Sequence, residues 1–257
     1  MSFVSTSTKQ PLISIITATY NSERFIKDTY DSILSQTYCN WEWIITDDCS
    51  TDNTYNILRQ IESRDSRVKI ERNIKNSGAA VSRNNCFRRS NGMYFAFLDS
   101  DDIWIKEKLH QQLDFMMSGC DFSFTAYEII DENRKKLNRI IDFKQHPPIK
   151  YKDLLKKNAT IGCSTVMLRR SACEGLQMPL LRTGQDYATW LLVLKNGVSA
   201  YHLPQVLTQY RIVKNSISRN KIKKAKRQWQ IYREIEKLDL IQSIICFCHY
   251  SVKAIIR

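Results

Sequence analysis

The first hundred residues alternate between short apolar runs and segments whose apolar side chains recur three and four positions apart. An alternation of strand and helix patterns predicts a parallel sheet with helices on both faces. The predicted strands are Leu12–Thr17, Trp41–Thr46, Val68–Ile70 and Tyr94–Leu98. The predicted helices begin after Ser22 and after Asp52, both as caps, and at Ala79 after a turn at residues 76–78.

Polar side chains follow three of the four predicted strands. Thr17–Asn21, Asp47–Asp52 and Asp99–Asp102 each begin where a strand ends. In sheets of this type, ligands bind beyond the carboxyl ends of the strands. The sequence therefore predicts a polar ligand site at this edge of the sheet.

The cluster after the fourth strand contains three carboxylates, Asp99, Asp101 and Asp102. Alternate residues of an extended backbone point the same way, so Asp99 and Asp101 can face one point. Two such charges repel unless a divalent cation or a proton resolves the conflict, and substrate phosphates often complete the shell of such a cation. The alternative is a helix N-cap for a helix beginning near Lys106, and we expect Asp102 to be that cap.

The chain of 257 residues carries 39 Lys and Arg against 26 Asp and Glu, a net charge of +13. This excess fits a nucleic acid, an anionic membrane face, a polyanionic ligand or plain solubility. Its eight cysteines form no CxxC pair, which predicts reduced thiols in a cytosolic protein. Neither a signal peptide nor a membrane span is predicted.

The second half is less regular, and the C-terminal tail changes character. We expect strands at Phe122–Ala126 and Ser164–Leu168, a loop or hairpin over 131–150, and a buried helix at Tyr187–Leu194. Residues 214–237 hold nine Lys or Arg against two Glu, and residues 240–256 are mostly apolar. This tail predicts either a peripheral anchor on an anionic membrane or a helix that packs on the domain with a solvated basic face.

Six segments, in order, resemble the family 2 inverting glycosyltransferases of the GT-A fold, which use nucleotide-activated sugars. They are Ile-Ile-Thr-Ala-Thr-Tyr-Asn (15–21), Ile-Ile-Thr-Asp-Asp-Cys-Ser-Thr-Asp (44–52), Asn-Ser-Gly-Ala-Ala-Val-Ser-Arg-Asn (76–84), Phe-Leu-Asp-Ser-Asp-Asp (97–102), Gly-Gln-Asp (184–186) and Tyr-Arg-Ile (210–212). The resemblance implies an α/β GT-A fold: a Rossmann-like, mostly parallel central sheet flanked by helices, with a helical basic tail. It divides a single domain into a nucleotide-sugar-binding half (1–110) and an acceptor-binding half (111–213), followed by the tail (214–257).

The resemblance also implies a UDP-sugar donor. The residues it assigns to the nucleotide-sugar are Thr17, Tyr20, Asn21, Asp48, Arg83, Asn84, Asp99, Ser100 and Arg211. The carboxylate of Asp48 can accept the uracil N3–H, although it could instead only cap the following helix. A solvated Arg83 and a surface Arg211 are further alternatives, and Ser216 accompanies Arg211 in the family's late Arg-and-Ser segment.

Two carboxylates and a metal ion complete the implied chemistry. Asp101 resembles the main metal ligand and Asp99 its partner, and the metal is Mn²⁺ or Mg²⁺, which neutralises the leaving UDP. Asp186 is the candidate base that takes the proton of the acceptor hydroxyl. Its alternative role is to N-cap the helix that follows, and Trp190 is expected in the core rather than as an acceptor platform.

The predicted function is a metal-dependent, inverting hexosyltransferase of O-antigen, lipopolysaccharide or capsule synthesis. We expect it to move glucose or galactose from a UDP-sugar to a sugar on polyprenyl diphosphate, in the cytoplasm and peripherally at the inner face of the plasma membrane. A sugar-phosphate nucleotidyltransferase would require a glycine-rich, basic phosphate loop after the first strand, which residues 17–21 lack. A nucleic-acid-binding protein would spread basic and aromatic residues over one face, whereas here the basic excess is concentrated in the tail, so we expect no nucleic-acid partner.

Overall fold

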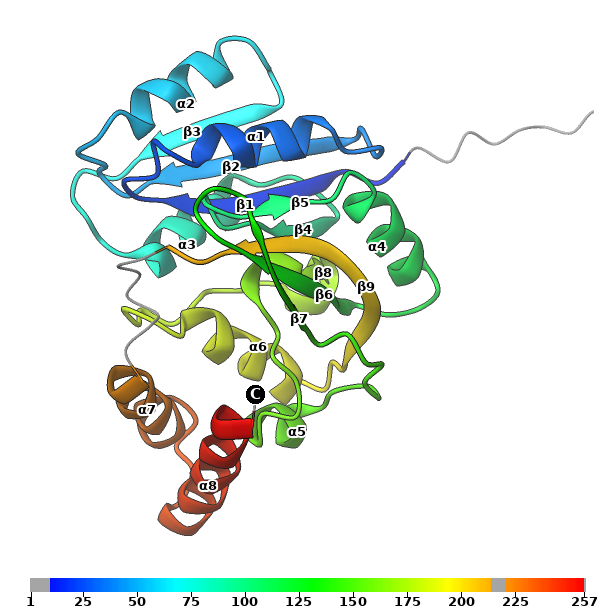
Figure 1. The fold of residues 1–257 in the computed structure, drawn as a ribbon, viewed down its shortest axis with the longest axis vertical. Coiled ribbons are helices and arrows are strands. Elements are labelled where there is room, and N and C mark those ends of the chain that lie inside the picture. Colours follow the sequence, from blue (N-terminus) through cyan, green and yellow to red (C-terminus); the bar gives the residue numbers. More distant parts are fainter. Residues whose placement is uncertain (1–9, 214–220, 257) are drawn as a thin grey trace, which may run out of the picture.

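One mixed sheet runs through the protein, with helices on both of its faces (Figure 1). The computed structural model describes residues 10–213 and 221–256. Within them nine strands join in the order β3-β2-β1-β4-β8-β6-β9-β5, and β7 pairs with β6. The strands are β1 (Ile13–Thr19), β2 (Trp41–Asp47), β3 (Val68–Arg72), β4 (Tyr94–Phe97), β5 (Ile103–Trp104), β6 (Phe122–Ile130), β7 (Lys136–Ile141), β8 (Met167–Arg169) and β9 (Ala200–Arg211).

The helices separate into two layers that cover opposite faces of the sheet. They are α1 (Ile26–Leu34), α2 (Thr54–Glu62), α3 (Ala79–Arg89), α4 (Lys108–Met117), α5 (Tyr151–Leu155), α6 (Gln185–Lys195), α7 (Lys221–Gln230) and α8 (Leu240–Ile256). Buried side chains of α1, α2 and α4 join one apolar core, and those of α3, α5 and α6 join the other. The predicted α/β architecture is confirmed.

The parallel strands supply both cores from alternate positions. Ile13 and Ile15 of β1 lie in the core beneath α1, whereas Ile16 lies in the core beneath α3. Successive side chains of a strand point to opposite faces, so a strand covered on both faces must be apolar almost throughout. The pairs β1·β2, β1·β4 and β2·β3 are all parallel, as predicted.

The second half contains a long strand that the sequence pattern did not predict. The twelve-residue β9 pairs in parallel with β6 and antiparallel with β5. Its register shifts between the pairs Thr125–Leu203 and Ala126–Val206, where Pro204 cannot donate a ladder hydrogen bond. The segment 131–150 contains the hairpin strand β7, while the predicted strand at Ser164–Leu168 begins instead as a 3₁₀ turn before β8.

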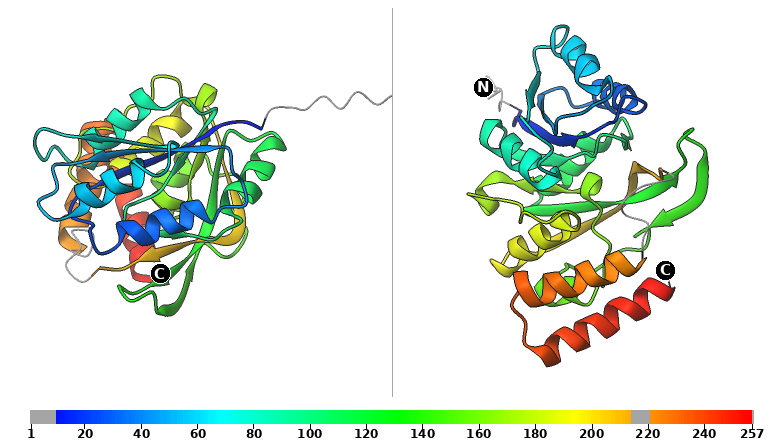
Figure 2. Two further views of the ribbon diagram at one scale, coloured as in Figure 1. Left: turned by 90° about the horizontal axis from the view of Figure 1, so that it is seen from above. Right: turned by 90° about the vertical axis from the view of Figure 1, so that its left-hand side faces the viewer.

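The tail packs on the domain. Helix α7 lies between α6 and α8 (Figure 2), and it continues as a π-helical turn through Ile231–Ile235. Ile231 and Tyr232 are buried, and the Tyr232 hydroxyl donates to the Leu155 carbonyl at 2.6 Å. Among the described residues, no helix is long and apolar enough to cross a membrane.

Candidate active site

The turn before α3 is held by Asp48 at the end of β2. Its Oδ1 accepts hydrogen bonds from the Ser77 N–H and the Asn73 amide, both at 2.8 Å, and its Oδ2 accepts one from the Gly78 N–H at 2.7 Å. Gly78 has φ +92°, a conformation that suits glycine. Asp48 therefore caps no part of α2. Asp52 lies one residue before the cap position of that helix, Asn53, and its Oδ1 accepts the Thr54 N–H at 3.0 Å.

The end of β1 splits into a buried part and an exposed part. Thr17 is completely buried, and its hydroxyl donates to the Leu98 carbonyl and accepts the Trp43 indole N–H, both at 2.8 Å. The predicted contact between Thr17 and the nucleotide is therefore wrong, because this side chain points into the core. Tyr20 is 45% exposed, and Asn21 accepts the Thr51 N–H at 2.8 Å, so these two lie at the surface of the same edge.

Arg83 lies beneath this edge, on the face of α3 that meets β4. It is buried and forms an ion pair with Asp99, so the solvated alternative is wrong. Its Nε and Nη1 have no hydrogen-bond partner in the described residues. Burial acts to lower the pKa of Arg83, but Cys163, Asp99 and Asp186 together raise it above its ordinary value. Arg83 is therefore a permanent cation between carboxylates of two different elements.

Asp186 approaches Arg83 from the first turn of α6. The cap position of this helix is Gly184, at φ +72°, so Asp186 lies inside the first turn and not at the N-cap position of its alternative role. Burial raises the pKa of the Asp186 carboxyl, while the Tyr187 N–H and the Arg83 charge act to lower it. A carboxylate with a raised pKa suits a general base. Trp190, one turn later, is fully buried against Phe97 and is a core residue, as expected.

Asp101 is the carboxylate most affected by its neighbours. Burial, and then the charge of Asp99, raise the pKa of Asp101 to about 7. No other side chain in the described residues donates a hydrogen bond to its carboxylate. A buried carboxylate whose ionisation a neighbouring carboxylate opposes fits a site for a hard divalent cation. The described residues hold no cluster of three metal-ligating side chains, so substrate oxygens or water would have to complete the shell.

Asp102 and Arg211 hold the loop after β4 in place from behind. The predicted helix cap at Asp102 is wrong: its carboxylate accepts hydrogen bonds from the Ser164 hydroxyl at 2.6 Å and the Arg211 N–H at 2.9 Å. Burial and the charge of Asp101 raise the pKa of Asp102 well above its ordinary value. Ser100 is buried as well, with its hydroxyl 2.8 Å from that of Ser22.

Arg211 is buried rather than on the surface. Its Nε donates to the Asp101 carbonyl at 2.7 Å, its Nη1 to the Glu132 carbonyl at 2.9 Å, and its Nη2 to Asp28 at 3.0 Å. Each guanidinium nitrogen thus contacts a protein acceptor, and the side chain positions Asp101 from behind. Ser216 lies outside the described residues.

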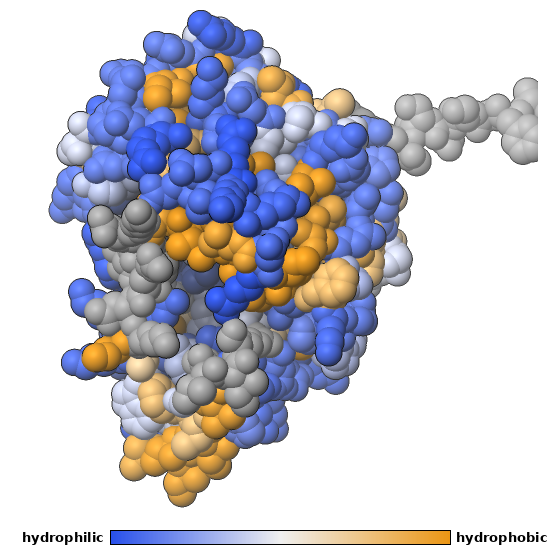
Figure 3. Space-filling model, viewed as in Figure 1, coloured by the Kyte–Doolittle hydropathy of each residue, from blue (hydrophilic) through white to orange (hydrophobic). Residues whose placement is uncertain are grey.

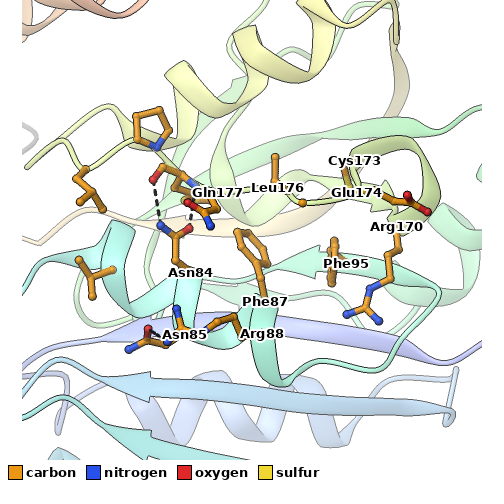
Figure 4. Close-up of a pocket in the computed structure, with 15 residues that line it drawn as sticks. Asn84, Asn85, Phe87, Arg88, Phe95, Arg170, Cys173, Glu174, Leu176 and Gln177 are labelled. Atoms are coloured by element: carbon orange, nitrogen blue, oxygen red, sulfur yellow. Dashed lines mark hydrogen bonds between the residues drawn. The ribbon is translucent and has the colours of Figure 1, made fainter.

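Asn84 faces away from its neighbour Arg83, towards a separate cavity of about 810 Å³ between α3 and residues 173–180. Its amide donates to the Met178 carbonyl at 3.1 Å and accepts the Met178 N–H at 2.7 Å (Figure 4). This pair of hydrogen bonds fastens the loop before α6 to α3. Asn84 therefore has a structural role, and the structure does not bring it together with Arg83, Asp99, Asp101 and Asp186.

Two residues with no motif around them also border the site. The Ser164 hydroxyl accepts the Asp99 N–H at 3.0 Å while it donates to Asp102, and thus connects the two ends of the carboxylate loop. Lys224 of α7 is close enough to Asp186 for the two charges to interact. Both contacts join segments far apart in the chain, so no local pattern could have predicted them.

Known proteins resemble this chain over most of its length. The sequence model described as Glycosyl transferase family 2 matches residues 14–176. TuaG of Bacillus subtilis, named for teichuronic acid biosynthesis as a glycosyltransferase, is 48% identical over 96% of this chain and 97% of its own. WfgD of Escherichia coli, named UDP-Glc:alpha-D-GlcNAc-diphosphoundecaprenol beta-1,3-glucosyltransferase, is 38% identical over 95% and 92%.

Solved structures share the fold at lower identity. S. aureus TarS 1-349 in complex with UDP-GlcNAc superposes with a TM-score of 0.71 at 20% identity, over 86% of this chain and 64% of that one. This chain therefore spans less than two thirds of the TarS fragment. The mannosyltransferase PcManGT from Pyrobaculum calidifontis, in complex with GDP-Man and Mn²⁺, has a TM-score of 0.70 at 17% identity, over 95% and 70%. The predicted GT-A fold is confirmed.

Proposed function

This chain belongs to glycosyl transferase family 2, and on that basis we propose that it transfers a hexose from a UDP-sugar to a sugar on polyprenyl diphosphate. The observation that carries the proposal is the convergence of Arg83, Asp99 and Asp186 at the carboxyl edge of the sheet. Glucose is favoured over galactose because WfgD, 38% identical, is named for UDP-Glc. The product would enter a surface polysaccharide, the process for which TuaG is named.

The donor would lie across the ends of β1, β2 and β4. The exposed ring of Tyr20 offers a stacking surface for uracil beside Asn21. Asp48 Oδ2 accepts only the Gly78 N–H, which leaves acceptor capacity for the uracil N3–H. Arg83 Nε and Nη1, which lack partners in the described residues, would donate to the diphosphate or the sugar.

A divalent cation, Mn²⁺ or Mg²⁺, would be held by Asp101 and Asp99. When bound, it would neutralise charge on the UDP leaving group. Two hydrogen bonds within the protein keep these carboxylates in place. The Arg211 guanidinium donates to the Asp101 carbonyl, and the Ser164 hydroxyl accepts the Asp99 N–H.

Asp186 would act as the base of an inverting transfer. The acceptor hydroxyl oxygen attacks the anomeric carbon from the face opposite UDP, the bond from that carbon to the UDP oxygen breaks, and the hydroxyl proton passes to the Asp186 carboxylate. Arg83 favours the ionised form of Asp186 before the transfer, because its positive charge lowers the pKa of that carboxyl.

The tail would bring the enzyme to the membrane that bears its acceptor. Helix α8 exposes an apolar face, seen at the lower end of Figure 3. The side chains of this face are Ile241, Ile244, Ile245 and Val252, between 47% and 71% exposed. An apolar helix face beside basic residues is typical of a helix that lies in an anionic interface.

The transfer itself is tested with UDP-glucose and a synthetic N-acetylglucosaminyl-diphosphoryl lipid. We expect the wild-type protein to form a β-linked product that NMR identifies, and Asp186→Asn to lower kcat by about 10²- to 10⁴-fold. Binding of UDP-glucose should be unchanged, because Asp186 contacts the acceptor. Full activity of Asp186→Asn would contradict the base assignment, and an α-linked product would contradict inversion.

The metal site is tested by Mn²⁺ binding in the presence of UDP, followed by electron paramagnetic resonance. Asp101→Asn removes one ligand charge. Loss of even an outer-shell partner weakens metal binding by about 10- to 100-fold, so this variant should weaken Mn²⁺ binding by at least as much. Asp114→Asn, on the exposed side of α4, removes the same charge elsewhere and should have no effect. Equal Mn²⁺ affinities of the two variants would exclude Asp101 as a ligand.

Membrane contact is tested by sedimentation with phosphatidylglycerol vesicles. Ile241→Lys combined with Ile245→Lys should reduce vesicle binding about tenfold or more, because two apolar side chains are lost from the buried face. Gln242→Lys adds a charge to the same turn outside the apolar face and should leave binding equal or stronger. Unchanged binding of the double variant would mean that α8 does not enter the interface.

A further inference from the structure

Helix α7 packs closely against the segment that contains Asp186. A Cβ on Gly184 would lie 3.2 Å from Ile231 Cδ1 and 3.4 Å from Arg227 Cγ, so any larger residue would crowd α7 here. The Arg227 Nε donates to the Thr183 hydroxyl at 3.3 Å. Because Ile231 is buried in the same core as α6, the position of α7 is fixed relative to Asp186.

Lys224 lies on the side of α7 that also carries Gln228 and Ile231, and its own side chain is exposed. It precedes Gln228 by four residues and Ile231 by seven, and both of these are buried, so the three share one side of α7. Its charge interacts with that of Asp186, but the two form no ion pair. Partial burial of its stem lowers the pKa of Lys224, and the charge of Asp186 opposes that change. In the described residues, no hydrogen bond or ion pair occupies its ammonium group.

The other side of the same helix provides a contrast. Lys226 lines a groove between α7 and α8, together with Ile222, Trp229 and Phe247. It has the same charge as Lys224 and is two residues away, yet it points away from Asp186. Lys224 therefore lies next to Asp186 because of the side of α7 that it occupies, and not because the tail as a whole is basic.

The proposed acceptor places a second diphosphate in this region. Its sugar is bonded directly to the diphosphate, so a hydroxyl at Asp186 puts the phosphates one sugar ring away. Arg83, and a metal ion if Asp101 and Asp99 hold one, would serve the donor diphosphate on the β4 side. Neither of these cations is placed to serve the acceptor diphosphate as well. A lysine ammonium binds phosphate as a compact point charge.

We propose that Lys224 binds the diphosphate of the lipid-linked acceptor and that α7 fixes it relative to Asp186. This inference rests on the proposed function and adds the part of the site that recognises the acceptor's anionic group. The tail is then part of the acceptor site as well as the segment nearest the membrane. An acceptor with the same sugar but no phosphate would not contact Lys224.

The test compares Lys224→Gln with Lys226→Gln on two soluble acceptors, without any membrane. One acceptor is N-acetylglucosaminyl-diphosphoryl-alkyl, and the other is the alkyl N-acetylglucosaminide without phosphate. Lys224→Gln should raise the KM and the Kd for the diphosphate acceptor about tenfold or more, the loss expected for one charge-assisted contact. The kcat pH profile, the KM for UDP-glucose and the use of the neutral acceptor should not change, and Lys226→Gln should match wild type throughout.

Each other outcome has a defined meaning. Equal losses on both acceptors, or a shifted kcat pH profile, would overturn the proposal and show that Lys224 acts on Asp186 instead. An effect seen only with anionic vesicles would assign Lys224 to the membrane surface and overturn it as well. If wild type binds the diphosphate acceptor Lys224-dependently but transfers no hexose to it, the proposed function fails while this inference stands. Transfer by Lys224→Gln with an unchanged KM would overturn this inference while the proposed function stands.

Discussion

The buried guanidinium of Arg83 is the interaction on which the candidate site depends. An isolated charge in a protein interior costs several kcal/mol, so it persists only where opposite charges and hydrogen bonds compensate it. Here Asp99 comes from the loop after β4 and Asp186 from the first turn of α6. One cation thus joins the donor-side carboxylate to the proposed base. Two nitrogens of Arg83 lack partners in the described residues, and these are the donors proposed for the diphosphate or the sugar.

The rest of the fold keeps these three residues in place. Asp48 fixes the turn from which α3 begins, and so fixes Arg83. Ser164 and Arg211 hold the carboxylate loop from behind, through hydrogen bonds to Asp102 and to the backbone of residues 99 and 101. Ser164 and Arg211 are therefore positioning residues for the groups that would contact substrate. Asp48 has a second proposed role, as the acceptor of the uracil N3–H.

The sequence predicted the first half of the fold because each parallel strand is apolar on both faces and each helix has its own period. It missed β9, whose ladder is interrupted at Pro204 and whose paired residues on β6 lie about eighty positions earlier in the chain. For the candidate site, the sequence predicted only the edge of the sheet at which it lies. Which way a side chain points at a strand end depends on distant partners, such as Trp43 for Thr17 and Ser164 for Asp102. Motif position alone could not separate Arg83, which faces Asp99, from Asn84, which faces Met178.

The electrostatic link between Arg83 and Asp186 is most directly tested by the pKa of the Asp186 carboxyl, followed by ¹³C NMR and assigned with Asp186→Asn. The charge of Arg83 lowers this pKa, so Arg83→Met should raise it. Arg88→Met removes a cation from the opposite face of α3 and should leave the pKa unchanged. A pKa of Asp186 that is the same in wild type and Arg83→Met would contradict the account.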